Sequence, residues 1–570
     1  MTHIHSITRR LVDARTGFFK AESRGVRTQV LPTSRAVKYN RAQMGWALTK
    51  SAAVFALLLL GLTVHANNIT LGTPGLTGEN RSQGYVFVTF DLSWSNSWRE
   101  STGAANWDAA WVFVKYRIAG GDWQHAKLHN TGHLAGAGTA ATVSARLIDD
   151  HTPFEPFGNP GVGVFIHRSA DGVGAFTNTG VKLRWNYSAN GIIEGASVEV
   201  RVFAIEMVYV REGSFNVGGG GGTNAFNSTT INTADATSGA TGSGALGGAE
   251  GGYPAGQTAP ANASWPNGYN AFYCMKYEVT QQEYVGFLNT LTQAQANNRR
   301  VYANSNRYSI IGSVVGNYSA SLPYVACNYL RGEDGMAFAD WSGLRPMTEL
   351  EFEKACRGDQ YPISGEYAWG TQYLVYDYNI ANNTNNTHND EYYYNYTYQY
   401  YELDNIGTSN EGIATNYDNY SGLFGNVNCV TQINGMGYNS MYDSYDYYIF
   451  DLFNYRGPLR VGIFAANGLN NSRLTSGASY WGIMELSGNL WEFCIGSYFY
   501  AGGQGDGILD SNGNNNEPNW FESLWRGGSW ANYAASSQVS DRGGFFGNQI
   551  PQSSNTGNNL DKCGFRAIRN

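Results

Sequence analysis

A chain of 570 residues is too long for one ordinary hydrophobic core, so we expect two folded domains with extensions. Residues 1–66 hold ten of the 37 Lys and Arg residues but only two of the 45 acids, which leaves 27 basic and 43 acidic residues and a net charge near −16 in the remainder. So acidic a surface argues against nucleic acid or an anionic lipid surface as the main partner.

The first predicted element is an export signal within residues 1–66. A basic flank precedes an apolar run from Ala52 to Leu62, and the segment ends in Val64-His65-Ala66. This pattern is typical of a Sec-type signal cleaved after Ala66, and the run is too short to span a bilayer comfortably. Met44 is a second candidate start, because it would begin a signal of ordinary length. With no cysteine at the cleavage point for a lipid anchor, we expect a secreted, periplasmic or cell-surface protein that does not span the membrane.

Residues 67–205 are predicted to form an all-β domain. Clusters of Gly, Asn and Asp separate five apolar runs, which are Tyr85–Trp94, Trp111–Arg117, Val162–His167, Val181–Tyr187 and Val198–Ile205. Regularly spaced runs with such punctuation predict an antiparallel, sandwich-like arrangement.

The same segment contains His125, His129 and His133, whose spacing of four would align them as metal ligands on a helix. Gly120-Gly121 precedes them and Asn130-Thr131-Gly132 interrupts them, so a helix is disfavoured here. We therefore interpret the three histidines as solvent-exposed residues of loops or strands.

Residues 206–570 are predicted to form a second domain of helices and strands. Its residues 216–265 are rich in Gly, Ala and Ser, which predicts a flexible surface loop. Thr280 caps a predicted helix that carries Tyr284 and Phe287, and Gly335–Ser342 form a second helix. A third begins at Thr348, where Glu351 completes a capping box.

Residues 371–456 form an insertion rich in Tyr and Asn. The favoured interpretation is a surface hairpin whose tyrosines pack on one another, because long insertions in surface loops usually cost little stability and often have no function of their own. The alternative is a binding surface, since Tyr offers a large contact area at low entropic cost.

All six cysteines lie beyond residue 270: Cys274, Cys327, Cys356, Cys429, Cys494 and Cys563. In an exported chain they could form up to three disulfides, with 15 pairings open. They have no CxxC spacing, which favours a structural role over a metal or redox role.

Several motifs carry a family resemblance. The most specific are Gly488-Asn489-Leu490-Trp491-Glu492 and Arg526-Gly527-Gly528-Ser529-Trp530, accompanied by Tyr277–Thr280, Leu344–Gly358 and the closing Cys563–Ala567. In order and spacing, residues 206–570 resemble the formylglycine-generating-enzyme, or sulfatase-modifying-factor, family. The resemblance implies an α+β fold of the C-type-lectin-like kind, here preceded by the all-β domain.

The resemblance also implies a structural Ca²⁺. In the family, an acidic or amide side chain three residues before Gly-Asn-x-Trp-Glu, the final Glu and two backbone carbonyls surround the ion. These positions fall on Glu485, Gly488, Leu490 and Glu492. Such oxygen ligands suit Ca²⁺. The alternative is that Glu492 only accepts hydrogen bonds from nearby backbone amides.

The catalytic chemistry of the family is not expected. Family oxidases bind copper through two cysteines that follow the Arg-Gly-Gly-Ser segment, and counting from Arg526 places them at Asn532 and Ser537. Neither residue is the soft ligand that Cu(I) needs. A related iron-dependent branch uses several histidines, whereas His388 is the only histidine beyond residue 167. We therefore expect no copper, no iron and no catalytic residue, and keep a formylglycine-generating or non-haem iron oxidoreductase as the alternative.

Recognition of a protein or glycan ligand is the favoured function. In lectin-type folds the stretch after Arg526–Trp530 lies on the ligand face, and adaptable binding surfaces mix aromatic with small polar residues. We predict contacts from Asn532, Tyr533, Ser536, Ser537, Asp541, Phe545, Phe546 and Asn548.

The mixture of Tyr, Ser, Asp, Gly and Phe in this stretch also resembles the variable region of proteins diversified by retroelements, where mutagenesis acts on adenines. Ordinary drift of a family loop is the alternative. A near-repeat of codons 525–566 beside a reverse transcriptase gene, differing only at adenines, would distinguish the two.

Overall fold

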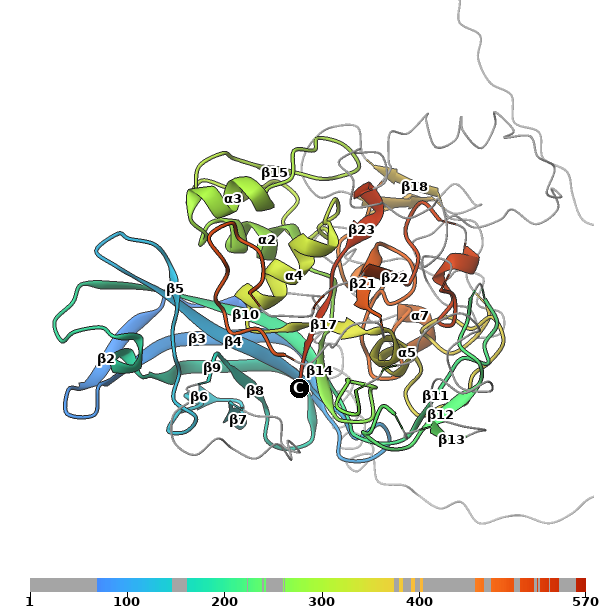
Figure 1. The fold of residues 1–570 in the computed structure, drawn as a ribbon, viewed down its shortest axis with the longest axis horizontal. Coiled ribbons are helices and arrows are strands. Elements are labelled where there is room, and N and C mark those ends of the chain that lie inside the picture. The colour runs from blue at the N-terminus through green and yellow to red at the C-terminus, as the bar shows by residue number, and fades with distance from the viewer. Residues whose placement is uncertain are drawn as a thin grey trace, which may run out of the picture. The chain divides into compact units, whose positions relative to one another are not determined.

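The computed structural model describes residues 69–145, 161–222, 224–237, 240–241, 260, 262–373, 379–382, 391–394, 400–402, 457–465, 473–496, 503–516, 520, 523–532, 534–542 and 560–570. The predicted export signal and Met44 lie outside these residues. Within them, no helix is both long and apolar enough to cross a membrane. Helices and strands are mixed, with strands predominating (Figure 1).

A first sheet has five strands, in the order β1-β3-β9-β6 with β2 paired to β3. Its two long strands pair antiparallel, with Val86 opposite Trp185 at one end and Arg99 opposite Gly172 at the other. The strands are β1 (Thr70–Leu71), β2 (Gly75–Asn80), β3 (Tyr85–Arg99), β6 (Ala137–Gly138) and β9 (Gly172–Trp185).

A second sheet has eleven strands, in the order β22-β21-β17-β24-β14-β10-β4-β8-β7, with β23 paired to β21 and β5 to β4. The strands are β4 (Asp108–Ile118), β5 (Gln124–His125), β7 (Ala141–Ser144), β8 (Val164–Arg168), β10 (Val198–Val210), β14 (Phe272–Met275), β17 (Arg345–Thr348), β21 (Trp491–Ile495), β22 (Ser523–Arg526), β23 (Cys563–Gly564) and β24 (Ala567–Arg569).

Strand β10 joins the two segments that the sequence analysis divides at residue 205. It pairs with β4 from Val198 to Val208, and its last four residues, Met207–Val210, also pair with β14 on the other side. The apolar run therefore does not end at Ile205 but continues as one strand through Val210. The two segments share one continuous sheet.

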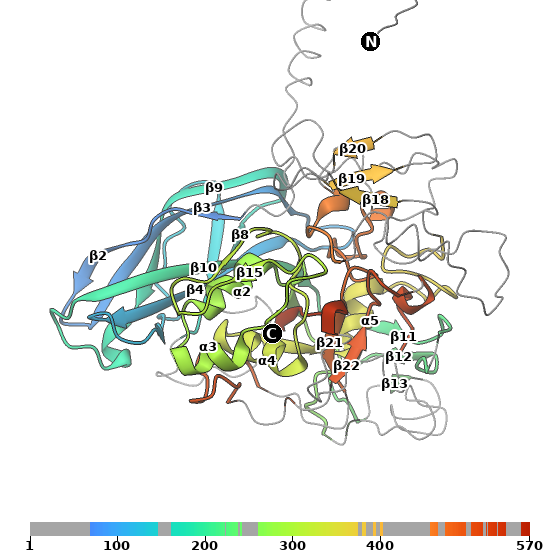
Figure 2. The same ribbon diagram turned by 90° about the horizontal axis from the view of Figure 1, so that it is seen from above.

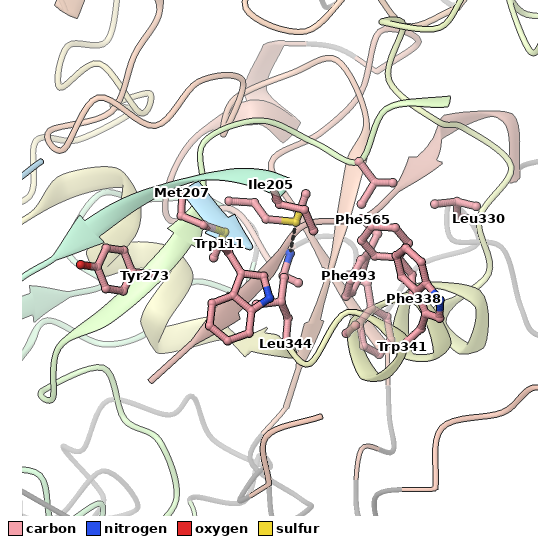
Figure 3. Packing of buried hydrophobic residues seen from close by; sticks show 14 of the residues in the cluster. Trp111, Ile205, Met207, Tyr273, Leu330, Phe338, Trp341, Leu344, Phe493 and Phe565 are labelled. Atoms are coloured by element: carbon pink, nitrogen blue, oxygen red, sulfur yellow. Dashed lines mark hydrogen bonds between the residues drawn. The ribbon is translucent and has the colours of Figure 1, made fainter. Parts of the chain in front are cut away.

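Strand β4 is buried on both faces because its side chains alternate between two cores. Ala110, Val112 and Val114 face the first sheet, where they join the cluster that contains Phe90 and Trp185. The intervening residues Ala109, Trp111 and Phe113 belong to a second cluster with residues of the helices. Figure 3 shows Trp111, Met207, Trp341 and Phe493 of this second cluster. Figure 2 shows the resulting layers, with β3 and β9 on one side of β4 and β10 and the helices on the other.

The helices are short and locally specified. Thr280 and Thr348 cap α2 and α5, as predicted. The capping box of Thr348 with Glu351 is also confirmed, and Thr280 forms a second box with Glu283 that was not predicted. The predicted helix over Gly335–Ser342 is α4, which begins three residues earlier. The helices are α2 (Gln281–Leu288), α3 (Gln293–Arg299), α4 (Gly332–Trp341), α5 (Glu349–Arg357) and α7 (Arg473–Ser476).

Three small sheets complete the described secondary structure. Two of them are β15 (Ile310–Ile311) with β16 (Ser319–Ala320), and, within the Tyr- and Asn-rich insertion, β18 (Asn379–Asn382) with β19 (Glu391–Tyr394) and β20 (Tyr400–Glu402). The third is formed by β11 (Phe215–Val217), β12 (Thr229–Ile231) and β13 (Ala240–Thr241).

This third sheet corrects the expectation of a flexible loop over residues 216–265, because part of that stretch packs into the core. Val217, Phe226 and Ile231 are buried in the helix-side cluster. Gly218 has a φ of +66°, and a Cβ there would lie 2.2 Å from the carbonyl oxygen of Phe226. The glycine therefore permits a close backbone contact. Residues 242–259 lie outside the described part of the chain.

The expected disulfides do not form among the five described cysteines, all of which are buried free thiols. Cys274, Cys356 and Cys494 lie in one apolar cluster with Met347 and Phe352, where they serve as small hydrophobic residues. Cys327 and Cys563 belong to the larger cluster. Cys429 lies outside the described residues.

His125 is buried rather than exposed, which corrects the expectation for this histidine. The Lys115 Nζ donates to the His125 Nδ1 at 2.9 Å, and the His125 Nε2 donates to the Val162 carbonyl. The same ammonium group donates to the carbonyls of Trp341 (2.7 Å) and Gly507 (3.0 Å), so it joins β4, α4 and the 503–516 segment. Burial lowers the pKa of Lys115 to about 7.

We predict that Lys115 makes stability depend on pH. Its folded pKa lies below the ordinary 10.5, so between these two values the unfolded chain binds a proton that the folded chain does not. The free energy of unfolding should therefore rise with pH through this window. Relative to Lys115→Met, wild type should gain on the order of 2 kcal/mol between pH 7 and pH 9. Urea unfolding at both pH values measures this, and a constant difference between the two proteins would contradict it.

Candidate functional site

The Arg-Gly-Gly-Ser-Trp segment begins in β22 and bends sharply after it. Arg526 pairs with Glu492 of β21 in the sheet, and the next two residues, Gly527 and Gly528, have φ values of +89° and +72°. A Cβ at Gly528 would lie 2.4 Å from the Ser537 Oγ. The glycines therefore let the chain fold back so that the short turn Ala534–Ser537 lies directly against this bend.

The two positions that the family resemblance assigns to copper-binding cysteines, Asn532 and Ser537, both follow this bend in the chain. The Asn532 Oδ1 accepts hydrogen bonds from the Trp491 indole at 2.8 Å and from the Ser529 hydroxyl, which fixes the amide. Ser537 is fully buried, and its hydroxyl has no hydrogen-bond partner among the described residues. Its carbonyl accepts from the Ser487 hydroxyl at 2.7 Å. Amide and hydroxyl oxygens at these positions are hard ligands.

The five described cysteines do not supply a thiolate in place of the missing pair. Burial raises the pKa of Cys356 and Cys494 well above its ordinary value, which keeps both as neutral thiols. Across the described ranges, no three His, Cys, Asp or Glu residues are placed as metal ligands. His129 and His133 use ring nitrogens for local hydrogen bonds to the backbone near Thr131 and Arg184.

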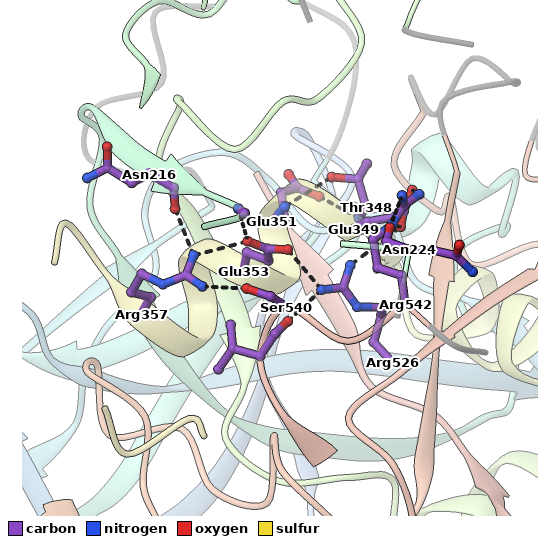
Figure 4. A network of polar contacts seen from close by, with 12 residues as sticks. Asn216, Asn224, Thr348, Glu349, Glu351, Glu353, Arg357, Arg526, Ser540 and Arg542 are labelled. Carbon is purple, nitrogen blue, oxygen red and sulfur yellow. Dashed lines mark hydrogen bonds and ion pairs between the residues drawn. The ribbon is translucent and has the colours of Figure 1, made fainter. Parts of the chain in front are cut away.

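A buried ionic network holds the chain after β22 against helix α5 (Figure 4). Arg542 donates to both carboxylate oxygens of Glu349, at 2.6 and 2.8 Å. Arg526 donates to Glu353 at 3.0 Å and to the Val539 carbonyl at 2.6 Å. Arg357 donates to Glu353 at 3.0 Å and to the Ser540 hydroxyl at 3.1 Å.

These charges compensate one another inside the protein. Burial alone would raise the pKa of Glu353, but the guanidinium groups of Arg357 and Arg526 hold it below its ordinary value. The carboxylate therefore stays ionised and keeps its pairing with both arginines. The result is a fixed support for residues 526–542.

The residues predicted to contact a ligand differ in accessibility. Asn532 and Ser536 are partly exposed, whereas Ser537 and Asp541 are buried. Tyr533, Phe545, Phe546 and Asn548 lie outside the described residues. Within the described part of this segment, Asn532 and Ser536 are thus the accessible members of the predicted set.

Two of the four predicted calcium ligands, Glu485 and Glu492, are buried carboxylates. Glu485 has a φ of +54°; one of its oxygens accepts from the Gly462 amide at 2.8 Å, and the other is buried with no hydrogen-bond partner in the described ranges. Burial raises the pKa of Glu485 to about 7. An orphaned carboxylate oxygen of this kind fits a hard cation.

Glu492 does not fit the predicted calcium set. Arg566 donates to both of its carboxylate oxygens, at 2.6 to 3.0 Å, and fully occupies that side of the group. Glu278, which the sequence analysis did not assign to the site, accepts from the Leu490 amide at 2.9 Å and from the Asn489 side chain. Burial, together with Glu492, raises the pKa of Glu278 well above its ordinary value.

The sequence contained a signal for the ionic network that the motif analysis did not use. Glu349, Glu351 and Glu353 lie in the first turns of a helix whose residues are all buried, so each carboxylate needs a partner. The arginines at 345, 357, 526 and 542 supply these partners.

Comparison with known proteins gives one finding. A family model described as "Sulfatase-modifying factor enzyme 1-like domain" matches residues 199–570. None of the curated proteins matches the chain.

We predict that removing one member of the network strongly destabilises the fold. Glu349→Gln leaves the buried Arg542 guanidinium without its carboxylate, so the free energy of unfolding should fall by about 3 to 5 kcal/mol. Glu333→Gln is the matched control, because Glu333 also lies in the first turn of a helix but pairs with Arg331 at the surface. It should change stability by less than about 1 kcal/mol. Equal denaturation midpoints for the two variants would contradict the buried network.

Proposed function

The chain belongs to the family of sulfatase-modifying factor enzyme 1-like domains, and from this premise we propose that it is an exported, non-catalytic member that binds a protein or glycan ligand. One observation carries the proposal. At the position where an oxidase of the family needs a copper thiolate, the Asn532 amide is held by Trp491 and Ser529. This arrangement suits recognition better than redox chemistry.

The proposed contact surface is the segment that follows β22, on a domain of C-type-lectin-like fold. Its described part is anchored by Arg526 and Arg542, while Asn532 and Ser536 remain partly accessible. A rigid support beneath adaptable side chains limits the conformational entropy that binding costs. Because Ser537 and Asp541 are buried, they would act by holding the segment in place rather than by touching a macromolecule. Diversification of this segment by a retroelement stays a hypothesis that the gene neighbourhood can decide.

We also propose a structural Ca²⁺ bound at Glu485. The orphaned Glu485 oxygen supports it, with the backbone carbonyls of Gly488 and Leu490 as the other protein ligands. Glu492 is left out, because its pairing with Arg566 satisfies it. Such an ion would neutralise a buried carboxylate and so stabilise the fold.

The proposed lack of oxidase chemistry can be tested by comparing Cu(I) binding in wild type with Cu(I) binding in a variant that restores both cysteines. We expect purified wild type to bind no stoichiometric Cu(I) in a competition titration with a colorimetric chelator. The double variant Asn532→Cys with Ser537→Cys should bind one Cu(I), because it supplies two soft ligands at the bend. Stoichiometric copper in wild type, with oxygen consumption and turnover of a cysteine peptide, would establish the oxidase alternative instead.

The calcium proposal predicts a thermal shift. Removal of Ca²⁺ with a chelator should lower the melting temperature of wild type, and added Ca²⁺ should restore it. Glu485→Gln should melt at one temperature with or without Ca²⁺, whereas Glu492→Gln should melt lower than wild type yet keep the Ca²⁺ response. A Ca²⁺ response in Glu485→Gln equal to that of wild type would rule out the site.

A further inference from the structure

A cavity of about 420 Å³ lies between the chain after α3 and the β15–β16 hairpin. It is lined by residues 300–304 on one side and by Ile310, Ile311, Gly312 and Tyr318 on the other. Its volume falls within the range of small-molecule sites, roughly 300–1,000 Å³. None of its lining residues belongs to the bend after β22 or to the carboxylate group around Glu485.

Arg300 brings a positive charge to this cavity that no acid neutralises. In the described part of the chain its guanidinium makes no ion pair or side-chain hydrogen bond, and it stacks on the Tyr302 ring, 3.7 Å from the centroid. Nine other buried or half-buried arginines in the described ranges make ion pairs, as Arg331 does with Asp334. The donors of Arg300 therefore remain available to an anion, and a planar guanidinium matches a carboxylate in a two-point contact.

Tyr318 lines the cavity, but its hydroxyl is not part of the accessible lining. Its side chain is buried, and its hydroxyl has no hydrogen-bond partner within the described ranges. A buried hydroxyl normally has such a partner, because leaving it unpaired costs free energy. This hydroxyl has almost no accessible surface, so a ligand in the cavity would not reach it.

The rim of the cavity is apolar and open to solvent. Tyr302 is 76% exposed and Ile311 is 68% exposed. An exposed tyrosine ring fixed by a stacked arginine offers a flat apolar face beside a cation. This combination fits a ring that has an apolar C–H face and also carries an anionic group.

The hairpin side of the cavity is preformed. The side chain of Asn289, the C-cap of α2, accepts from the amides of Gly316 (2.9 Å) and Tyr318 (3.0 Å), and it donates to the Tyr318 carbonyl at 2.8 Å. Gln293 of α3 accepts from the Val315 amide at 2.9 Å. Binding therefore does not have to order this loop, which favours measurable affinity for a small ligand.

We propose that this cavity binds a carboxylate-bearing sugar residue of the hexuronic acid class. Arg300 pairs with the carboxylate, and the exposed Tyr302 ring packs on the sugar face. A neutral sugar leaves the Arg300 charge unused, and an acyclic acid leaves the Tyr302 face uncovered. The site is independent of the proposed contact surface after β22.

Binding of three small probes to the full exported chain tests the proposal by calorimetric titration. The probes are methyl glucuronide (ring and carboxylate), methyl glucoside (ring alone) and N-acetylglutamate (carboxylate alone). We expect methyl glucuronide to bind at least about tenfold more tightly than either of the others, because each lacks one of the two contacts.

Variants locate the binding. Arg300→Gln and Tyr302→Ala should each weaken methyl glucuronide binding by about tenfold or more. Arg300→Lys keeps the charge but loses the planar guanidinium, so its affinity should lie between those of wild type and Arg300→Gln. Arg81→Gln and Tyr361→Ala are the matched controls, since Arg81 lies in the turn between β2 and β3 and Tyr361 is 83% exposed elsewhere. Both should bind as wild type does, and thermal melting verifies that every variant folds.

Three outcomes would overturn the proposal. They are no glucuronide binding by wild type, equal binding of glucuronide and glucoside, and a preference for N-acetylglutamate, which would point to an acidic peptide. Because Asn532 and Ser537 are unchanged in all these variants, failure here leaves the proposed function after β22 standing. Likewise, a failed copper test would contradict the proposed function after β22 but would not affect the hexuronic acid site.

Discussion

The pairing of β4 with β10 is the constraint on which the rest of the described structure depends. Eleven residue pairs, from Val198 opposite Ile118 to Val208 opposite Asp108, join these strands. The side chains of β4 pack into one hydrophobic core on each face of the strand. A shift of one residue in its register with β10 would therefore move every β4 side chain from one core to the other. Lys115 is tolerated in this strand because three acceptors surround its ammonium group.

Buried charges recur in the second sheet and around it, and several of the ion pairs join segments distant in sequence. Arg566 near the C-terminus meets Glu492, Arg542 meets Glu349, and Lys276 meets Glu206. Pairs of this kind contribute little net stability, but breaking one leaves an uncompensated charge in the interior. They therefore specify which segments meet, and in this chain they determine where the bend after β22 lies. Glu485 stands apart, since one of its oxygens has no hydrogen-bond partner in the described residues.

Local features of the fold could be predicted from the sequence, and long-range ones mostly could not. The caps of α2 and α5 depend on residues three apart, so Thr280 and Thr348 revealed them. The extension of β10 to Val210 depends on pairing with β14, more than sixty residues away, which no local pattern encodes. The disulfide expectation followed from the presumed compartment, whereas five thiols are placed by packing. For the site, motif spacing identified Asn532 and Glu485, but the pairing of Glu492 with Arg566 required the folded chain.

Strand β10 also bears on how such a protein could arise or be recombined. The family match begins at residue 199, one residue into a strand that pairs along most of its length with the segment before it. A gene fragment that began at this boundary would encode the strand without its partner and would expose an unpaired edge together with Ile205 and Met207, which are buried here. A recombination that separated the two segments would therefore break this pairing and expose residues of both cores.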